Sequence, residues 1–201
     1  MENKKKDIIE ITARLMHSKG YGATSVKDIM EAAGIGKGQF YYYFSSKEEL
    51  GLAVVDDCFE KWQQRVIMGN LAKNEKPQVR IERMLSCMIE VHQSRESKCG
   101  CFFGNLAIEL SEHNAIFREK IATMFACWTE ELEILIDQWQ KEHRTTVGGN
   151  SRLLAVNIVA LLEGAILLMK SQQSINPLLQ AAVMVKKILG MEAGSEKYLE
   201  K

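Results

Sequence analysis

The chain has 201 residues, of which 46% are hydrophobic and 26% are charged, and its formal net charge is zero. These values predict an ordinary globular chain, long enough to fold around a substantial core in one or two small domains. Only 2 prolines and 14 glycines interrupt long stretches of Leu, Ile, Met, Ala, Glu and Lys, so we expect an all-α protein.

The charge is distributed unevenly along the chain. The first 47 residues carry eight Lys or Arg against five Asp or Glu, so the remainder has an acidic excess of three. A neutral total argues by itself against a nucleic-acid partner, whereas the basic N-terminal end is a candidate nucleic-acid footprint. The alternative for the run NKKKD is a solvated helix start.

Three features bear on the cellular compartment. The charged N-terminus lacks an unbroken apolar core followed by a small-residue cleavage site, so we expect a cytoplasmic protein. The apolar run 153–169 is interrupted by Asn157, Glu163 and Gly164 and is shorter than the roughly 18 to 20 residues of a membrane span, which favours a buried helix. Five cysteines without an export signal are more consistent with thiols than with a disulfide framework.

The first two helices are expected near the N-terminus. The first covers about residues 4–20, with Ile8, Ile11 and Leu15 on one face, joined by Ile9 and Met16 at the seven-residue spacing. The second covers 26–33, where Ser25 and Asp28 form a possible capping box and Thr24 is a competing cap.

A short helix and a long one follow. Gly34 ends the second helix, a turn of about three residues follows, and KGQFYYYF predicts a short third helix over 37–44. A fourth helix is expected over 45–66. Helix, tight glycine-containing turn and helix form the pattern of a helix-turn-helix.

The chain changes character after about Lys76, where longer helices with broader apolar stripes are expected. A boundary near 69–75 separates an N-terminal domain, 4–64, from a C-terminal domain, 76–190. The clearest helix is 115–143, in which apolar residues recur at spacings of three and four, and a loop follows it at 144–150. The helices expected in the C-terminal domain are 78–93, 101–111, 115–143, 151–172 and 176–189, the last capped by Asn176 before Pro177.

The short third helix carries more aromatic surface than a small domain buries. Phe40 and Phe44 lie four residues apart and form the expected buried stripe, while Tyr41, Tyr42 and Tyr43 point in successive directions about 100° apart. All three tyrosines cannot face the core. In a helix-turn-helix the second helix enters the major groove, so the tyrosines are expected to meet phosphates, sugars or thymine methyl groups. The alternative is that the aromatic residues only pack against the neighbouring helices.

The segment TSVKDIMEAAGIGKGQFYYYFSSKEEL resembles the DNA-binding segment of the TetR family of bacterial transcriptional regulators. This resemblance implies a three-helix DNA-binding domain and no enzymatic activity. The phosphate or base contacts that it implies come from Thr24, Ser25, Lys27, Lys37, Gln39, Tyr41, Tyr42, Tyr43 and Lys47. Two positions depart from the family pattern, since Gly36 replaces a frequent Ser and Tyr43 stands where His is common.

The remainder resembles the family's ligand-binding and dimerisation domain in the number and length of its helices. The segment GCFFGNLAIELSEHNAIFREKI resembles a subgroup with a GC-x-x-GNL motif, some of whose members respond to electrophiles through a cysteine. Candidate effector or redox residues are Cys101, Cys99, Phe102, Trp128 and Glu163. The resemblance implies no cofactor.

Cys101 is the most plausible sensor, because it lies at a predicted helix start, where the helix dipole lowers the pKa of a thiol. The alternative is a small buried hydrophobic residue, the usual role of an unbridged cysteine. Glu163 interrupts an apolar helix, and a buried carboxylate needs a partner: an effector, a neighbouring group or a dimer seam. Neither the cysteine nor the histidine spacing indicates a metal site.

The prediction is therefore a homodimer that binds a roughly palindromic double-stranded operator and releases it when a small molecule or thiol modification shifts the larger domain. A repressor is favoured over an activator. The alternatives are a constitutive architectural DNA-binding dimer without an effector, and a thiol-dependent enzyme built around Cys101 for which no His with Asn or Asp partner is identifiable. No membrane partner is expected.

Overall fold

The structure is a computed structural model that describes residues 2–71, 75–143 and 149–191. All regular secondary structure in these residues is helical, as the composition predicts. The elements are α1 (Glu2–Lys19), α2 (Val26–Ala33), α3 (Lys37–Tyr43), α4 (Lys47–Trp62), the π-helix η1 (Gln63–Leu71), α5 (Pro77–Gln93), α6 (Phe102–Leu110), α7 (Ala115–His143), α8 (Ser151–Gln172) and α9 (Asn176–Ile188).

The chain packs into two compact units. The head unit contains the described residues up to Trp62 together with Phe102–Ala122, and the core unit contains Gln63–Cys101 with the described residues from Thr123 onward. The division at 64–76 predicted from the sequence follows the chain order, whereas packing also places α6 and the start of α7 with the N-terminal helices. The chain therefore passes between the units after Trp62, at the Cys101–Phe102 peptide bond and again within α7.

The first helix of the head unit buries only part of the predicted stripe. Ile8 and Met16 are buried as predicted, and Thr12 lies between them, while Ile9, Ile11 and Leu15 are only half-buried. The Thr12 hydroxyl donates a hydrogen bond to the Ile8 carbonyl at 2.7 Å, which satisfies its polarity inside the core. The spacing of apolar residues alone does not reveal a buried threonine of this kind.

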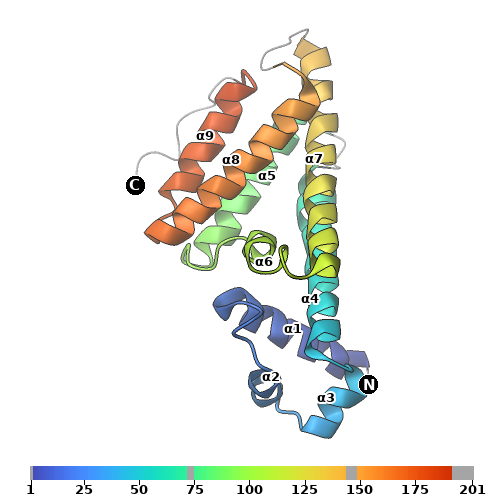
Figure 1. The fold of residues 1–201 in the computed structure, drawn as a ribbon. Helices are drawn as coiled ribbons and strands as arrows, with labels where there is room; N and C mark the ends of the chain where they lie inside the picture. Colours follow the sequence, from blue (N-terminus) through green and yellow to red (C-terminus); the bar gives the residue numbers. More distant parts are fainter. Residues whose placement is uncertain (1, 72–74, 144–148, 192–201) are drawn as a thin grey trace. The chain divides into compact units, whose positions relative to one another are not determined.

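The predicted helix-turn-helix is present in the head unit, where α2 and α3 lie beside each other (Figure 1). Ser25 is the N-cap of α2, and its side chain and that of Asp28 form the reciprocal capping box. Gly34 ends α2 in the left-handed conformation with φ 61°, as a helix C-cap requires. The competing cap, Thr24, is not used.

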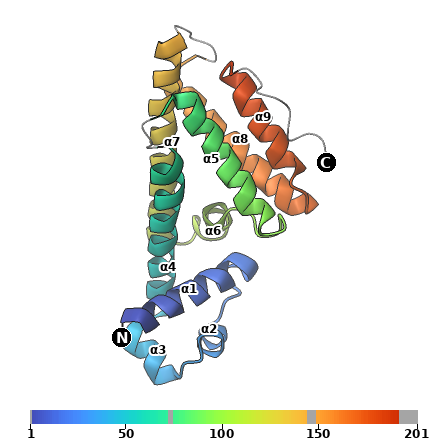
Figure 2. The ribbon, with the colours of Figure 1, turned by 180° about the vertical axis from the view of Figure 1, so that it is seen from behind.

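The core unit is built mainly from α5, α8, α9 and most of α7. Helices α8 and α9 lie side by side, and α5 lies next to α9 (Figures 1 and 2). The stripe predicted for α7 is confirmed, because all of its members are buried: Phe117, Ile121, Met124, Trp128, Leu132, Leu135 and Trp139. The first two belong to the head unit and the others to the core unit.

Two features of the helix boundaries differ from the sequence prediction. The fourth helix ends at Trp62, and a π-helix follows, where the sequence predicts a regular helix to residue 66. The N-cap of α9 is Ile175, so Asn176 is its first residue and not its cap. Most of the predicted loop 144–150, and part of the predicted boundary 69–75, lie outside the described residues.

Helix α8 has one buried and one exposed apolar side. By length and composition it is the single described helix that meets the requirements for a membrane span. However, eight of its side chains are buried within the protein. This is the pattern of a core helix with a second apolar surface to cover.

Candidate functional site

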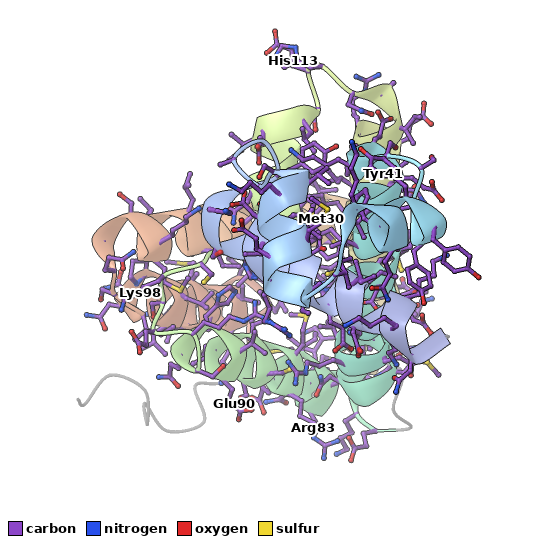
Figure 3. All side chains as sticks on the ribbon, turned by 90° about the horizontal axis from the view of Figure 1, so that it is seen from below. Met30, Tyr41, Arg83, Glu90, Lys98 and His113 are labelled. Atoms are coloured by element: carbon purple, nitrogen blue, oxygen red, sulfur yellow. The ribbon has the colours of Figure 1, made fainter. Side chains whose placement is uncertain are left out.

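The helix-turn-helix presents a polar and aromatic surface. Figure 3 shows the molecule from below, with Met30 on α2 and Tyr41 on α3 labelled. Of the predicted DNA contacts, Ser25, Lys27, Lys37 and Gln39 are exposed. We call the exposed side chains of α2 and α3, with Ser25, the reader surface.

The aromatic residues of α3 and its C-cap Phe44 divide as predicted, with the exception of Tyr43. Phe40 and Phe44 are 0% and 1% exposed, whereas Tyr41 and Tyr42 are 50% and 68% exposed. Tyr43 is half-buried and makes an edge contact with Tyr42, with ring centroids 5.0 Å apart. The buried phenylalanines fix the helix on the head, and this leaves the phenol groups of Tyr41 and Tyr42 on the reader surface.

Basic and amide groups accompany the tyrosines. The Lys37 ammonium, at the first position of α3, makes no hydrogen bond or ion pair within the described residues. Lys27 forms an exposed ion pair with Glu31 at 3.7 Å, which stabilises little in water and yields easily to a phosphate. Gly36 provides no side-chain cap for α3, so the loss of the family's frequent Ser leaves the first-turn N–H groups without that acceptor.

Two of the predicted contacts have roles inside the head. Thr24 is 1% exposed and its hydroxyl donates to the Gly20 carbonyl at 2.6 Å, so its side chain supports the turn before α2. The Lys47 ammonium donates to the Gly22 carbonyl at 3.3 Å and lies 4.3 Å from the centre of the Tyr21 ring. Burial lowers the pKa of Lys47, an effect that the nearby Glu109 and Asp28 carboxylates oppose.

Other lysines of the basic end also serve the fold. Lys4 donates to the carbonyl of Ala33 at 3.0 Å, at the last residue of α2. Lys19 pairs with Asp28 at 3.0 Å. Hydrogen bonds from Ser25, and then Lys19, hold the pKa of Asp28 well below its usual range. The N-terminal positive charge is therefore partly structural, and Lys37 is the clearest lysine available to a phosphate.

A second candidate site lies in the core unit, where two of the predicted residues meet. Cys101 immediately precedes α6, and its thiol hydrogen bonds to the carboxyl group of Glu163 on α8. Burial raises the pKa of Glu163 to about 7, and the bond from Cys101 opposes this shift. Sequence alone leaves the partner of Glu163 open, because 62 positions separate the two residues along the chain.

The remaining effector candidates lie elsewhere. Phe102 makes an edge contact with His17 at a centroid separation of 5.7 Å, within the head unit. Trp128 is 3% exposed, with its indole Nε1 3.3 Å from the Met84 sulfur, so it is a core residue. Cys99 is half-buried, as are the other cysteines, and all five are thiols. No three potential metal ligands gather among the described residues.

One interaction within the head is not predicted from the sequence. The Glu109 carboxylate, near the end of α6, accepts hydrogen bonds from the backbone N–H groups of Tyr21 and Gly22. The glycines at 20 and 22 are the local signal of a close approach, but nothing in the sequence indicates a partner 87 positions away.

Comparison with known proteins agrees with this architecture. Residues 8–54 match the family model described as bacterial regulatory proteins of the tetR family, and residues 77–184 match that of the LmrA/YxaF-like transcriptional regulator C-terminal domain. An uncharacterized HTH-type transcriptional regulator from the lacX 3′ region of Lactococcus lactis subsp. lactis is 35% identical over 182 residues, covering 89% of each chain. The HTH-type transcriptional repressor DhaR of Mycobacterium sp. strain GP1 is 30% identical over 182 residues, covering 90% of this chain and 89% of that one.

A solved structure gives the same fold. The crystal structure of regulatory protein TetR from Rhodobacter sphaeroides has a TM-score of 0.82 at 23% identity and covers 91% of this chain and 97% of that one. The two matching family models and the relatives that match along most of the chain agree with the capped helix-turn-helix and the helical core unit. The chain belongs to the TetR family of bacterial transcriptional regulators.

Proposed function

We propose that this regulator is a homodimeric, cytoplasmic repressor whose reader surface holds a palindromic operator and releases it when Cys101 is modified or an effector binds the core unit. The observation that carries the DNA-binding part is the exposure of Tyr41 and Tyr42 beside Lys37 and Gln39 on a capped helix-turn-helix. The segments 4–64 and 76–190 serve in this proposal as the DNA-binding and effector domains.

Each residue type of the reader surface suits one part of a duplex. Lys37 and Lys27 supply charge to phosphates, and Ser25 and the tyrosines supply hydroxyl donors. The Gln39 amide has the donor and acceptor needed to pair with an adenine edge in the major groove. Thr24 and Lys47 act mainly by supporting the turn before α2, with any phosphate contact of Lys47 secondary to that role.

The second apolar side of α8 supports dimerisation through α8 and α9. Leu153, Val156, Leu167 and Leu168 of α8 are 44% to 57% exposed, and Met184 of α9 is 47% exposed. A monomer leaves this surface in water, while a twofold partner covers it with the same surface. Two heads then reach successive major grooves about 34 Å apart, and an effector that favours another spacing weakens binding.

The hydrogen bond between Cys101 and Glu163 supports the thiol-responsive part of the proposal, together with the GC-x-x-GNL motif of the electrophile-responsive subgroup. In this proposal the Glu163 carboxylate, which accepts the hydrogen bond from Cys101, takes up the thiol proton as the thiolate forms. The thiolate sulfur then bonds to the β-carbon of an α,β-unsaturated carbonyl compound, the carbon–carbon π bond breaks, and a proton returns to the α-carbon. Modification enlarges the side chain directly before α6.

Alkylation with N-ethylmaleimide tests the proposal. We expect the treated protein to lose operator affinity by roughly five- to a hundredfold, the usual range of coupling between two sites, and Cys101→Ser to resist the treatment. Cys99→Ser, which removes the neighbouring thiol, should respond as the unsubstituted protein does.

Two outcomes separate the alternatives. Equal loss of binding by treated Cys101→Ser, or full retention by the treated unsubstituted protein, makes Cys101 a packing residue and leaves a non-covalent effector. A protein that binds DNA but responds neither to alkylation nor to any compound in a melting-temperature screen is the constitutive architectural dimer.

A further inference from the structure

The α1–α2 turn is held by a single acidic side chain from α6. Glu109 Oε2 accepts a hydrogen bond from the backbone N–H of Tyr21 at 2.9 Å, and Oε1 accepts one from Gly22 at 2.5 Å. Both oxygens of the carboxylate are used, and both donors belong to consecutive residues of one turn. Hydrogen bonds to an ionised acceptor are about twice as strong as neutral ones, so this carboxylate is a specific clamp on the turn.

The two glycines of the turn leave room for this carboxylate. A Cβ atom added at Gly22 would lie 2.9 Å from Glu109 Oε1, and one added at Gly20 would lie 3.1 Å from Oε2. Gly20 also has φ +87°, a conformation that glycine adopts without strain. The sequence Gly-Tyr-Gly therefore fits a turn that must bring its backbone against Glu109.

The Tyr21 side chain fixes the other side of the same turn. Its ring lies 5.1 Å from that of Phe117, and a Cβ atom at Gly51 would lie within 3 Å of both rings. Lys47 lies over the Tyr21 ring and donates to the Gly22 carbonyl. The turn is thus enclosed by α4, α6 and α7, with Glu109 providing the carboxylate that its backbone N–H groups bind.

The turn leads directly into the reader surface. Thr24 donates to the Gly20 carbonyl, and Ser25 is the N-cap of α2. Only two residues separate Gly22 from Ser25, so a displacement of the turn changes where α2 begins. We propose that Glu109 is a positioning residue for operator binding, which sets the phosphate-facing first turn of α2 without touching DNA itself.

This inference rests on the proposed function and predicts a change in DNA affinity that is opposite to the usual one. Loss of a negative charge from a DNA-binding domain ordinarily strengthens DNA binding, because it removes repulsion from phosphates. If Glu109 positions the turn, Glu109→Gln weakens binding instead, since the amide has one oxygen acceptor for two N–H donors. The two effects therefore oppose each other.

The experiment measures fluorescence anisotropy with a duplex that the unsubstituted protein selects from random-sequence DNA. For Glu109→Gln we expect roughly tenfold weaker binding, within the range of a charge-assisted hydrogen bond. We also expect the slope of log K against log salt to fall by about 0.9 for each phosphate that the displaced α2 no longer neutralises. Partial unfolding reduces the active fraction but does not change this slope.

Glu112→Gln is the matched control, because it removes the same charge from the exposed segment three residues after Glu109. We expect its binding to be unchanged or slightly tighter. Gly22→Ala is the second test, since it keeps Glu109 in the sequence but adds a methyl group that displaces its carboxylate. As a single substitution it should weaken operator binding, and it should have little further effect in a protein that already carries Glu109→Ala.

The outcomes are distinct. Binding by Glu109→Gln that equals or exceeds that of the unsubstituted protein overturns the positioning role, as does an unchanged salt slope. Should Glu109→Gln fail to fold, an unaffected Gly22→Ala variant overturns the inference in the same way. If the unsubstituted protein selects no duplex, the proposed function fails and the inference fails with it.

Discussion

Two surfaces of this molecule expose large apolar side chains, and they differ in what accompanies those side chains. On α3, Tyr41 and Tyr42 carry hydroxyl groups and lie beside Lys37 and Gln39. On α8, the large apolar side chains that are exposed are aliphatic, and between Val156 and Leu168 the polar side chain exposed beside them is that of Asn157. The first surface offers hydrogen-bond donors and positive charge, while the second is mainly aliphatic and has no exposed charged side chain between these two residues.

The difference indicates two kinds of partner. A surface of phenol, amide and ammonium groups suits an anionic partner that presents base edges, because each group replaces its hydrogen bond to water with one to the partner. An aliphatic helix face gains free energy only from the burial of its apolar surface away from water, so it suits a second aliphatic face. Substitutions on each surface test this contrast.

The largest effect is expected from a charge on the aliphatic surface. Leu168 is 53% exposed on α8. The substitution Leu168→Glu would bring two carboxylates, one from each protomer, into a twofold interface. We expect monomers by light scattering and a loss of roughly 10²- to 10⁴-fold in operator affinity, as linked binding by two heads is lost.

Ile134→Glu is the control, because Ile134 is 51% exposed in the core unit but lies on α7. It should remain dimeric and bind the operator normally. A dimeric Leu168→Glu protein would place the seam on a surface other than α8.

The same contrast explains what the sequence predicts well. In the head, capping residues, glycines and aromatic residues each have a local physical role, so the sequence alone predicts the places of Ser25, Gly34, Phe40 and the exposed tyrosines. In the core unit, apolar spacing predicts the helices and the α7 stripe. Spacing alone does not predict that α6 packs with the head or that a π-helix follows Trp62.

Interactions between distant segments account for the remaining differences. The pairing of Glu109 with the α1–α2 turn, and that of Cys101 with Glu163, depend on tertiary packing that no local pattern encodes. The same holds for Thr24 and Lys47, whose residue types suit phosphate contacts but whose positions place them in support of the turn. A family motif transfers residue types more reliably than it transfers their roles.

A smaller effect is expected on the buried side of α8. The pKa of Glu163 is raised to about 7 in the folded protein from an ordinary 4.5, so the folded state holds this proton more tightly than the unfolded state. The resulting stability is fully present below about pH 4.5 and is lost as the pH rises to about 7. Glu163→Gln stays neutral, so its free energy of unfolding should exceed that of the unsubstituted protein increasingly between about pH 5 and pH 8, by at most about 3 kcal/mol.

Thermal melts across this pH range measure the difference, with Glu130→Gln as the exposed control in the same unit. The control should show no such pH dependence. A gap between Glu163→Gln and the unsubstituted protein that stays constant with pH would mean that Glu163 titrates normally.

The smallest effect is expected from Lys37→Ala on the reader surface. Lys37 is exposed at the start of α3 and has no ion-pair partner among the described residues, so its removal costs the fold little. A phosphate contact from this lysine releases about 0.9 counterion, and the slope of log K against log salt should flatten by that amount for each head. Binding should weaken equally on specific and non-specific duplexes, because a phosphate contact does not read sequence.

Lys98→Ala is the control, because Lys98 belongs to the core unit and has a 59% exposed side chain. It removes the same charge from outside the reader surface and should leave the slope unchanged. Equal slopes for Lys37→Ala and the unsubstituted protein would show that the α3 lysine meets no phosphate, and the contrast between the two surfaces would then rest on the tyrosines and Gln39 alone.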